Sequence, residues 1–235
     1  MKCDFHIHTS YSFDSTTSPK EAVETAIKKG INCISITDHD EIKGALEAIK
    51  FSEGKPIIII PGIEVKTKEG DVLGLNIKTV IPKGLTAKET IKKIKEAGGM
   101  AIIPHPFGLN CSFRGNLENL LEEIDAIEVL NASLFGKENK KALDFSKKHN
   151  LPFTVGSDAH FPELIGSVCL EIPGDNLSFK EAVASSLASA KASAIKEILA
   201  KIKDKEGKIK GKKASLFEKI MERIKRNFAK LQNLL

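Results

Sequence analysis

Two histidines stand one residue apart near the start of the chain, in the stretch DFHIHTSYSFDS that begins at Asp4. Apolar and polar residues alternate there with the two-residue period of a β-strand. His6 and His8 therefore project from the same side of the strand, with Asp4 behind them. Two neighbouring imidazoles in a protein interior are costly unless something that they bind compensates. The spacing predicts a metal ion here, with further ligands from the rest of the chain.

Other histidines and carboxylates follow predicted strands in the same way. The residues in this position are His39, His105, His160, Asp14, Asp38, Glu64 and Asp158. Enzymes on parallel α/β scaffolds build their sites at the carboxyl ends of strands, so the shared position indicates one site. The sixth histidine, His149, ends a predicted helix, where we expect an ordinary exposed residue.

Imidazole and carboxylate ligands without cysteine suit Zn²⁺, Mn²⁺ or Fe²⁺. This set is too large for one four-coordinate ion. Two or three ions that share a bridging carboxylate fit it better, and clustered ions typically serve the hydrolysis of phosphate esters. The sequence therefore predicts a cofactor of two to three divalent metal ions.

Up to about residue 172, short β-rich runs alternate with helical patterns. The predicted strands are residues 2–8, 32–36, 56–60, 99–103, 125–130, 152–155 and 167–172, and the predicted helices are 19–29, 41–50, 87–97, 117–123 and 137–149. Ser18 and Asp40 are expected to cap the first two helices. Residues 71–80 are expected to form an added strand or hairpin arm. The alternation predicts a parallel α/β architecture, and both a closed barrel and an open sheet satisfy it.

The chain has 235 residues and a net charge of +5, which is unevenly distributed. Residues 1–175 carry 21 Lys and Arg against 25 Asp and Glu, whereas residues 176–235 carry 15 against 6. This asymmetry predicts a domain of residues 1–175 and a basic helical extension of residues 176–235. Helices are expected at 179–203 and after Ser215, joined by a charged linker at 204–213. The last helix carries an apolar stripe from Leu216 to Leu231, which predicts packing within the chain or in a homo-oligomer.

No run of residues has the length and apolarity of a membrane span, and the amino terminus lacks the pattern of a signal peptide. The four cysteines (Cys3, Cys33, Cys111 and Cys169) form no CxxC pair. We therefore expect free thiols in a reducing cytoplasm.

Five segments together resemble a known family. In order and spacing, DFHIHTSYSFDS, ITDHDEIKGALEA, PGIEV, IIPHPF and GSDAH resemble the motifs of the polymerase and histidinol phosphatase (PHP) superfamily, and most closely its stand-alone metal-dependent phosphoesterases. The resemblance covers about residues 2–172. It implies a distorted (β/α)7 barrel, here with a C-terminal helical extension, up to three metal ions at the carboxyl-terminal mouth, and activity on phosphate esters.

The resemblance also implies the metal ligands. The matching positions are His6, His8, Asp14, His39, Glu64, His105, Asn131, Asp158 and His160. Glu64 corresponds to the bridging carboxylate. Asn131 stands where many members carry histidine, and because an amide is a weaker, neutral ligand, the third ion is expected to be loosely held or absent.

Arg114 is the only arginine in the first 175 residues, in a chain that otherwise uses lysine. A guanidinium holds phosphate oxygens bidentately in a way that lysine cannot, which predicts a ligand for a substrate phosphate. Asp4, Asp38 and Glu128 are expected to orient histidines by accepting their outer N–H groups.

In the predicted reaction, a metal-activated hydroxide attacks phosphorus, the metals and Arg114 neutralise charge, and His160 or a metal-bound water assists proton transfer. Glu64 and Asp158 are catalytic in the sense that they hold the metals. The acidic barrel favours a small phosphomonoester, whereas the basic extension favours a polyanion such as the 5′ end of a nucleic acid. Tryptophan is absent and Tyr11 is the only tyrosine, so no aromatic platform for bases is expected. A non-catalytic, metal-stabilised binding module is the remaining alternative.

Overall fold

The computed structural model describes the chain except for residues 110, 112, 135, 173–187, 205–206 and 212–235. The expected helix after Ser215, with its apolar stripe, therefore lies outside the described residues, as does the first part of the helix predicted at 179–203.

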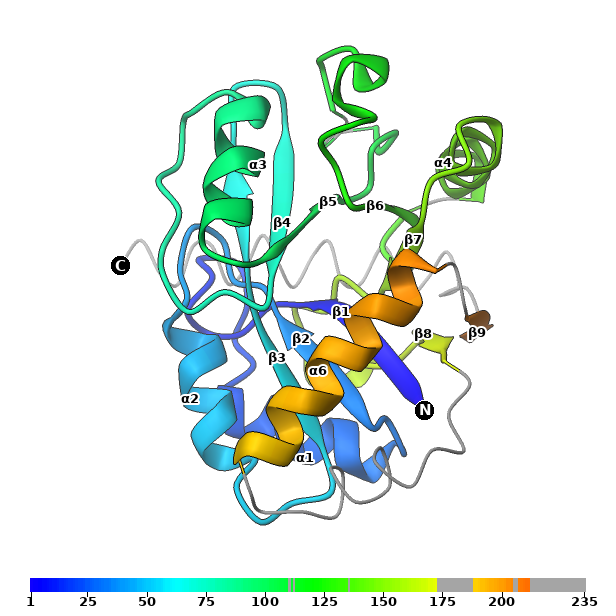
Figure 1. The fold of residues 1–235 in the computed structure, drawn as a ribbon. Helices are drawn as coiled ribbons and strands as arrows, with labels where there is room; N and C mark the ends of the chain where they lie inside the picture. Colours follow the sequence, from blue (N-terminus) through cyan, green and yellow to red (C-terminus); the bar gives the residue numbers. More distant parts are fainter. Residues whose placement is uncertain (110, 112, 135, 173–187, 205–206, 212–235) are drawn as a thin grey trace.

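Seven strands form a nearly closed barrel (Figure 1). In sheet order they are β1 (Lys2–Ile7), β2 (Cys33–Ile36), β3 (Ile58–Lys66), β4 (Asp71–Leu75), β5 (Met100–Ile103), β6 (Ala126–Asn131) and β7 (Phe153–Gly156). The chain after β7 returns to β1, where the Asp158 N–H donates to the His6 carbonyl (2.8 Å) and the His8 N–H donates to the Ala159 carbonyl (2.9 Å). This contact closes the barrel beside the two histidines, and the predicted fold class is confirmed.

Two strands take places that the alternating pattern did not reveal. β4 lies between β3 and β5 and is antiparallel to both. The turn between β3 and β4 is short, and only antiparallel strands can be joined without a long crossover. The strand predicted at 167–172 is β8 (Val168–Glu171), which pairs antiparallel with the beginning of β1 rather than joining the parallel set.

Part of the predicted linker at 204–213 is a strand. β9 (Lys208–Gly211) pairs antiparallel with β8 along its whole length. Its residues are exposed, so the hydrophobic pattern gave no sign of a strand. β9 forms because the edge of β8 offers backbone groups for hydrogen bonding, and the local sequence of β9 does not indicate this partner.

Helices cover the outside of the barrel. They are α1 (Pro19–Lys28), α2 (Lys43–Phe51), α3 (Ala87–Glu96) and α4 (Gly136–Lys148), with short 3₁₀ helices η1 (Leu117–Leu120) and η2 (Pro162–Leu164). Ser18 caps α1 as predicted, because its hydroxyl accepts a hydrogen bond from the Glu21 N–H (3.2 Å).

The prediction that Asp40 caps the next helix is wrong. Asp40 has a φ of 53°, and its carboxylate instead accepts a hydrogen bond from the Lys66 N–H (2.9 Å) at the end of β3. The Glu41 carboxylate accepts from the N–H groups of Ile42 and Lys43, so it satisfies the start of α2. Tertiary pairing with β3 thus competes successfully with the local capping preference.

A last described helix, α6 (Ala188–Lys203), contacts β3 and β7, which lie far apart in the sheet order (Figure 1, orange). Lys203 forms an ion pair with Asp125 (3.1 Å), which directly precedes β6. A helix that reaches both sides of the barrel and the beginning of β6 must cross its amino end. Ile198 and Ile202 of α6 are buried and belong to the same hydrophobic core as the strands.

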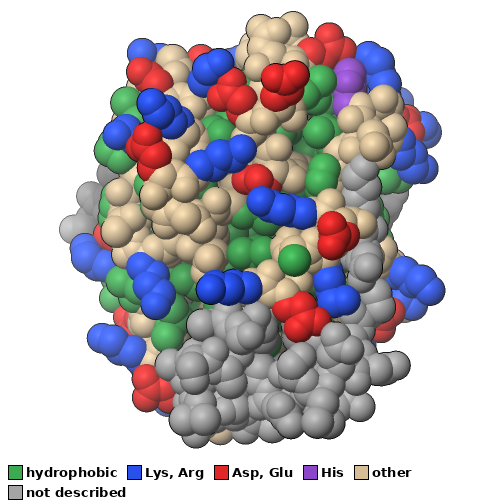
Figure 2. All heavy atoms as spheres, in the orientation of Figure 1, with side chains coloured by type: hydrophobic (Ala, Val, Ile, Leu, Met, Phe, Trp, Pro, Cys, Tyr) green, Lys and Arg blue, Asp and Glu red, His purple; other side chains and the backbone are tan. Residues whose placement is uncertain are grey.

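The core is dominated by isoleucine from the strands, which suits a pleated surface that is covered on both sides. On the face drawn in Figure 2, acidic and basic side chains of the described residues are interspersed. None of the helices in the described part of the chain has the length and apolarity that crossing a bilayer requires.

Candidate metal centre

The eight predicted histidine and acidic ligands meet at the carboxyl end of the barrel. They come from β1 and β3 and from the loops that follow β1, β2, β5 and β7. Their side chains are buried, apart from His39 (21% exposed) and a small part of Asp158 (9%). The structure therefore brings this part of the predicted set into one cluster with a narrow exposed edge.

Glu64 lies at the centre of this cluster because β3 continues past residue 60 to Lys66. Its Oε2 atom lies 3.4 Å from His6 Nε2, 3.2 Å from His8 Nε2 and 3.1 Å from His39 Nδ1. Its Oε1 atom lies 2.9 Å from His105 Nε2. One carboxylate thus faces four imidazoles, which is the arrangement needed to bridge two cations.

Two further carboxylates flank the cluster. Asp14 Oδ1 lies 3.5 Å from His39 Nε2 and 3.3 Å from His160 Nε2. Asp158 Oδ1 lies 3.3 Å from His8 Nε2. Asp158 Oδ1 also lies 3.6 Å from His6 Nε2, so each of the two carboxylates adds an anionic ligand atom beside at least two imidazole nitrogens.

The ligand atoms group into overlapping sets. Three sets of three residues have ligand atoms that all lie within 4.8 Å of one another: His6, Glu64 and His105; His6, His8 and Asp158; and His8, His39 and His160. Because His6 and His8 each belong to two sets, the sets describe adjacent positions that share ligands.

In three of the histidines, the ring nitrogen that points away from the cluster is hydrogen-bonded to a fixed acceptor. The contacts run from His6 Nδ1 to Glu128 Oε1 (3.1 Å), from His105 Nδ1 to the Cys111 carbonyl (3.2 Å) and from His160 Nδ1 to the Asp158 carbonyl (2.9 Å). An acceptor at Nδ1 places the proton there and leaves the Nε2 lone pair directed into the cluster. The predicted role of Glu128 is confirmed by its contact with His6.

His8 is oriented through a residue that the sequence did not single out. The Ser12 hydroxyl donates to Asp38 Oδ1 (2.8 Å), so its oxygen accepts from His8 Nδ1 (3.0 Å) and from the His39 N–H (3.0 Å). Asp38 therefore orients His8 through Ser12 rather than directly. A serine four residues after a histidine carries no sequence signal, because only the returning β2 loop completes the chain of hydrogen bonds.

These orientations leave lone pairs facing one another. His6 Nε2 and His8 Nε2 are 3.1 Å apart, and both outer nitrogens are committed as donors. Two lone pairs at this distance repel unless a cation lies between or beside them. The donor set of imidazole nitrogens and carboxylate oxygens fits Zn²⁺, Mn²⁺ or Fe²⁺.

The charge balance leads to the same conclusion. Burial alone would raise the pKa of Glu64, but the charges of His6 and His39 hold it well below its ordinary value. Burial alone would lower the pKa of His39, but Glu64 and Asp14 raise it to about 10. The cluster therefore attracts positive charge, as protons when no metal is bound, and divalent ions compete for the same atoms.

Asn131 lies beside the cluster. Its Nδ2 atom donates to Asp158 Oδ2 (3.3 Å) and to Glu128 Oε2 (3.0 Å), while its Oδ1 accepts from the Ser133 N–H (2.9 Å). These bonds fix two carboxylates of the site. The contacts suit an orienting residue better than the metal ligand that the family resemblance implies.

Asp4 does not orient an imidazole, so that prediction is wrong. Its carboxylate accepts from the N–H groups of Ser157 (2.9 Å), Gly166 (2.9 Å) and His6 (3.4 Å). Burial raises its pKa to about 6. Asp4 instead ties β1 to the segment that follows β7, because the alternation of the strand turns it towards that backbone.

Arg114 is exposed, and the contact that the structure gives it is from its backbone N–H to the Glu69 carbonyl. Its loop reaches the cluster at Cys111, whose carbonyl meets His105. His149 lies away from the cluster as predicted, but it is partly buried and pairs with Glu118 (3.5 Å).

Two of the ligands occupy unusual backbone conformations. His105 has a φ of 30° and Asp158 has a φ of 51°, both in the left-handed region that favours glycine. Hydrogen bonds hold them there, from the His105 N–H to Glu128 Oε2 (2.9 Å) and from the Asp158 N–H to the His6 carbonyl (2.8 Å). Such strain concentrates at functional sites, where the surrounding structure maintains it.

Gly156 is required by close packing. A Cβ atom at this position would lie 2.3 Å from His6 Cβ and 2.5 Å from Glu128 Oε1. The glycine of the GSDAH segment therefore lets His6 and Glu128 approach each other.

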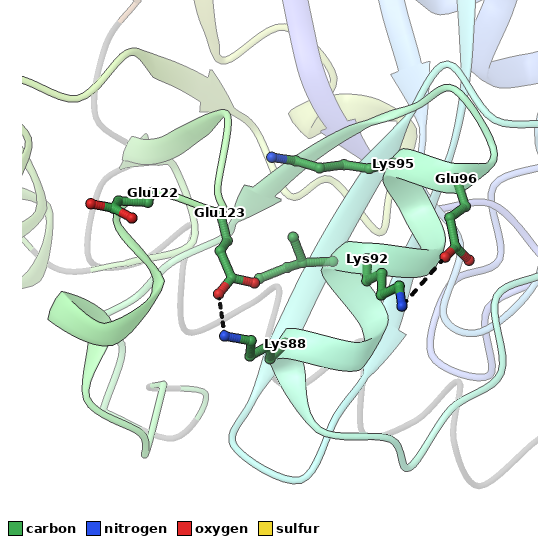
Figure 3. Close-up of a pocket in the computed structure, with 7 residues that line it drawn as sticks. Lys88, Lys92, Lys95, Glu96, Glu122 and Glu123 are labelled. Carbon is green, nitrogen blue, oxygen red and sulfur yellow. Dashed lines mark ion pairs between the residues drawn. The ribbon is translucent and has the colours of Figure 1, made fainter.

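A separate groove lies between α3 and the segment after η1 (Figure 3). Lys88 pairs with Glu123 (2.6 Å) and Lys92 pairs with Glu96 (3.8 Å) along it. None of its lining residues belongs to the metal cluster.

Comparison with known proteins agrees with this geometry. An uncharacterized protein of Methanocaldococcus jannaschii is 42% identical over 142 residues, which cover 56% of this chain and 82% of that protein. A 5′-3′ exoribonuclease of Haemophilus influenzae is 33% identical over 105 residues, 43% of this chain and 38% of that protein.

Among solved structures, a two-domain protein of Bacteroides vulgatus described as containing a predicted PHP-like metal-dependent phosphoesterase superposes with a TM-score of 0.67 at 18% identity. The match covers 90% of this chain and 64% of that protein. The family model described as the PHP domain matches residues 4–234. The chain therefore belongs to the PHP domain family.

Proposed function

We propose that this protein hydrolyses phosphate esters with two to three divalent ions, drawn from Mn²⁺, Zn²⁺ and Fe²⁺. The observation that carries the proposal is the position of Glu64, which faces four imidazole nitrogens at 2.9–3.4 Å in a buried cluster. A merely structural histidine cluster would not need this density of converging ligand atoms.

In this proposal the overlapping sets would hold adjacent ions. Because an imidazole Nε2 has one lone pair, His6 and His8 would each bind a single ion. Glu64, whose two oxygens face different imidazoles, would be the shared ligand. When bound, such ions lower the pKa of a coordinated water and neutralise charge on the phosphoryl oxygens. Asn131 and Glu128 hold the carboxylate and imidazole ligands in fixed orientations through hydrogen bonds.

The protein's own side chains supply orientation, proton transfer and phosphate binding. His160 presents Nε2 towards Asp14 and is proposed either to hold an ion or to exchange a proton at that atom; when it holds an ion, a water molecule transfers the proton. Arg114 is proposed to hold phosphate oxygens from the loop that follows His105. Substrate is proposed to enter at His39 and Asp158, the exposed edge of the cluster.

A small phosphomonoester is the proposed substrate. The ligands are buried except at one edge, which suits a compact phosphate group. Residues 1–175, which include all the ligands, carry more acidic than basic residues, and this balance does not favour a polyanion.

The second candidate substrate is the phosphorylated 5′ end of a nucleic acid, which the match to the Haemophilus influenzae 5′-3′ exoribonuclease favours. A non-catalytic binding module is disfavoured because such a module has no need for a complete set of converging ligands.

The test combines metal analysis with a phosphatase screen. Purified protein is reconstituted with Mn²⁺, its metal content is measured, and phosphomonoesters and a 5′-phosphorylated oligonucleotide are offered as substrates. We expect at least two ions per chain and turnover of a phosphomonoester that is lost in Asp158→Asn. Less than one ion per chain after reconstitution would contradict the proposal.

Two further assignments belong to this proposal. The four cysteines are free, which supports a reducing cytoplasm. A homo-oligomer formed through the C-terminal helices is also proposed, on the apolar stripe of residues 216–231.

A further inference from the structure

Large hydrophobic side chains are exposed at a few places in the described part of the chain. They are Tyr11, Phe13, Val80, Leu109 and Ile209. Tyr11 and Phe13 belong to the loop between β1 and α1, which also supplies Asp14 to the metal cluster. Leu109 belongs to the loop that begins at His105. Exposed apolar side chains therefore gather on the loops that carry ligands.

Phe13 is the one that contacts the cluster. Its ring stacks on the imidazole of His39, with ring centroids 5.1 Å apart and planes 25° apart. Phe13 is nevertheless 54% exposed. His39 is the most exposed of the eight clustered ligands, so a half-exposed phenyl ring stands beside the edge at which substrate is proposed to enter.

The loop that carries Phe13 is held in place on both sides of the ring. The Ser12 N–H donates to the Thr9 carbonyl (2.8 Å), and the Ser15 hydroxyl donates to the His160 carbonyl (2.8 Å). The Tyr11 hydroxyl donates to Glu47 Oε2 (2.7 Å) on α2. An aromatic surface fixed before binding costs little conformational entropy when a ligand stacks on it.

We propose that Phe13 is a specificity residue, and that its phenyl ring stacks on a planar ring carried by the alcohol portion of the phosphate ester, either a nucleobase or an aryl group. The inference rests on the proposed phosphoesterase function and narrows its substrate class. Aromatic rings stack on any flat π surface, so the platform selects for a ring without reading its edge.

The sequence leads us to expect no aromatic platform, and the proposed role of Phe13 departs from that expectation. That expectation considered tryptophan and tyrosine. The sequence alone does not show that a phenylalanine in a loop lies beside the metal cluster. That contact depends on the fold, in which β2 brings His39 next to the loop after β1.

The test compares substrates that differ by the ring. Values of kcat/KM are measured with Mn²⁺ for AMP against ribose 5-phosphate, and for phenyl phosphate against glycerol 2-phosphate. In Phe13→Leu and Phe13→Met, we expect the ratio of ring-bearing to ring-free substrate to fall at least about fivefold, the lower end of what one stacked base contributes. Phe13→Trp should retain the ratio, and Ile209→Ala on β9 serves as the control for loss of an exposed apolar side chain.

The two substrate pairs separate the sources of the ring. If the kcat/KM ratio falls only for the AMP pair, the ring that stacks on Phe13 is a nucleobase. If it falls only for the phenyl phosphate pair, that ring is an aryl group. Unchanged ratios in both pairs, in both non-aromatic variants, would overturn the inference.

Binding separates failure of this inference from failure of the proposed function. Calorimetry measures the Kd of AMP and of ribose 5-phosphate for the Mn²⁺-loaded protein, after equal metal content of the variants has been confirmed. If nothing is hydrolysed but AMP binds at least about fivefold more tightly than ribose 5-phosphate, and Phe13→Leu removes that preference, the stacking role stands and the phosphoesterase proposal fails. Hydrolysis without any such preference would instead support the phosphoesterase proposal and overturn the stacking role.

Discussion

The two ends of the barrel both bury titratable side chains, and they treat them in opposite ways. At the amino end, Cys3 of β1 lies opposite Cys33 of β2, and Cys169 of β8 lies nearby. At the carboxyl end, the same strand β1 contains His6 and is directly followed by His8. The beginning of this strand therefore lies beside thiols, and its end lies beside imidazoles.

Burial acts differently at the two ends because the neighbours differ. Burial raises the pKa of the Cys33 thiol well above its ordinary value and that of Cys169 to about 11, so these groups stay neutral. Burial alone would lower the pKa of His39, yet carboxylates raise it to about 10. The buried thiols therefore stay neutral, and the nearby Asp4 disfavours their ionisation further, whereas the His39 imidazole keeps its charge because its neighbours are oppositely charged.

The difference also explains how each end is covered. The amino end can be closed by the apolar face of α6, because nothing there has to bind an ion. The carboxyl end keeps an exposed edge at His39, through which ions and substrate can reach the cluster.

Replacing Glu64 should have the largest effect. Glu64→Ala removes the one carboxylate that faces four imidazoles, so we expect the loss of at least one bound ion and of detectable phosphoesterase activity. Metal analysis and turnover with Mn²⁺ measure both. Cys33→Ala, at the opposite end of the barrel, should retain its metal. Wild-type metal content in Glu64→Ala would contradict the central role of this residue.

Ile198→Ala tests whether α6 belongs to the folded barrel. Removing a fully buried side chain from a core typically costs about 2–5 kcal/mol, so urea unfolding should show a loss of that size. Lys196→Ala, on the exposed side of α6, is the matched control. Equal stability of the two variants would support a division of the chain at about residue 175, whereas the expected loss would join α6 to the barrel.

Ser12→Ala should reduce metal affinity about 10- to 100-fold, because removing a group that orients a ligand typically has an effect of this size. Titration with Mn²⁺ or Zn²⁺ measures it, and Ser12→Thr should restore part of the affinity. The control is Ser52→Ala, whose hydroxyl donates to the Ile49 carbonyl (2.8 Å) at the end of α2. Unchanged affinity in Ser12→Ala would mean that His8 does not depend on this hydrogen bond.

Arg114→Lys should lower kcat/KM by about tenfold, since a point charge replaces a bidentate phosphate contact. Metal content should be unaffected, because the side chain of Arg114 is exposed and outside the cluster. Unchanged kinetics would make Arg114 an ordinary charge on a surface loop.

The raised imidazole pKa values at the carboxyl end should also make the stability of the metal-free protein depend on pH. A histidine whose pKa is raised on folding stabilises the protein fully below its unfolded pKa, about 6.5, and loses that contribution as the pH rises through its folded pKa. Because the folded pKa of His39 is about 10, the free energy of unfolding of metal-free protein should decline between about pH 6.5 and 10.

Urea titrations at several pH values, in the presence of a chelator, measure this decline. His39→Gln should flatten it, and added Mn²⁺ should oppose it, because metal replaces the departing protons. Stability of the metal-free protein that is constant over this range would show that the imidazoles are not held in their charged form.

Local patterns in the sequence were enough to predict the α/β class and the residue types of the site, and the family resemblance added the barrel. Alternating strands and helices, and histidines or carboxylates just after the strands, are local patterns, and each can be read within a few residues. Because parallel strands end at one edge, these local positions were enough to predict that the eight acidic and imidazole ligands would meet.

Which atoms meet in the site depends on the tertiary structure. The bond between His6 and Glu128 joins residues 122 positions apart and depends on closure of the barrel. The left-handed conformations of His105 and Asp158, the turning of Asp40 towards Lys66, and the antiparallel insertion of β4 likewise depend on partners far along the chain or on neighbouring strands. Local preferences set what each segment can do, and packing between segments distant in the sequence selects among those possibilities.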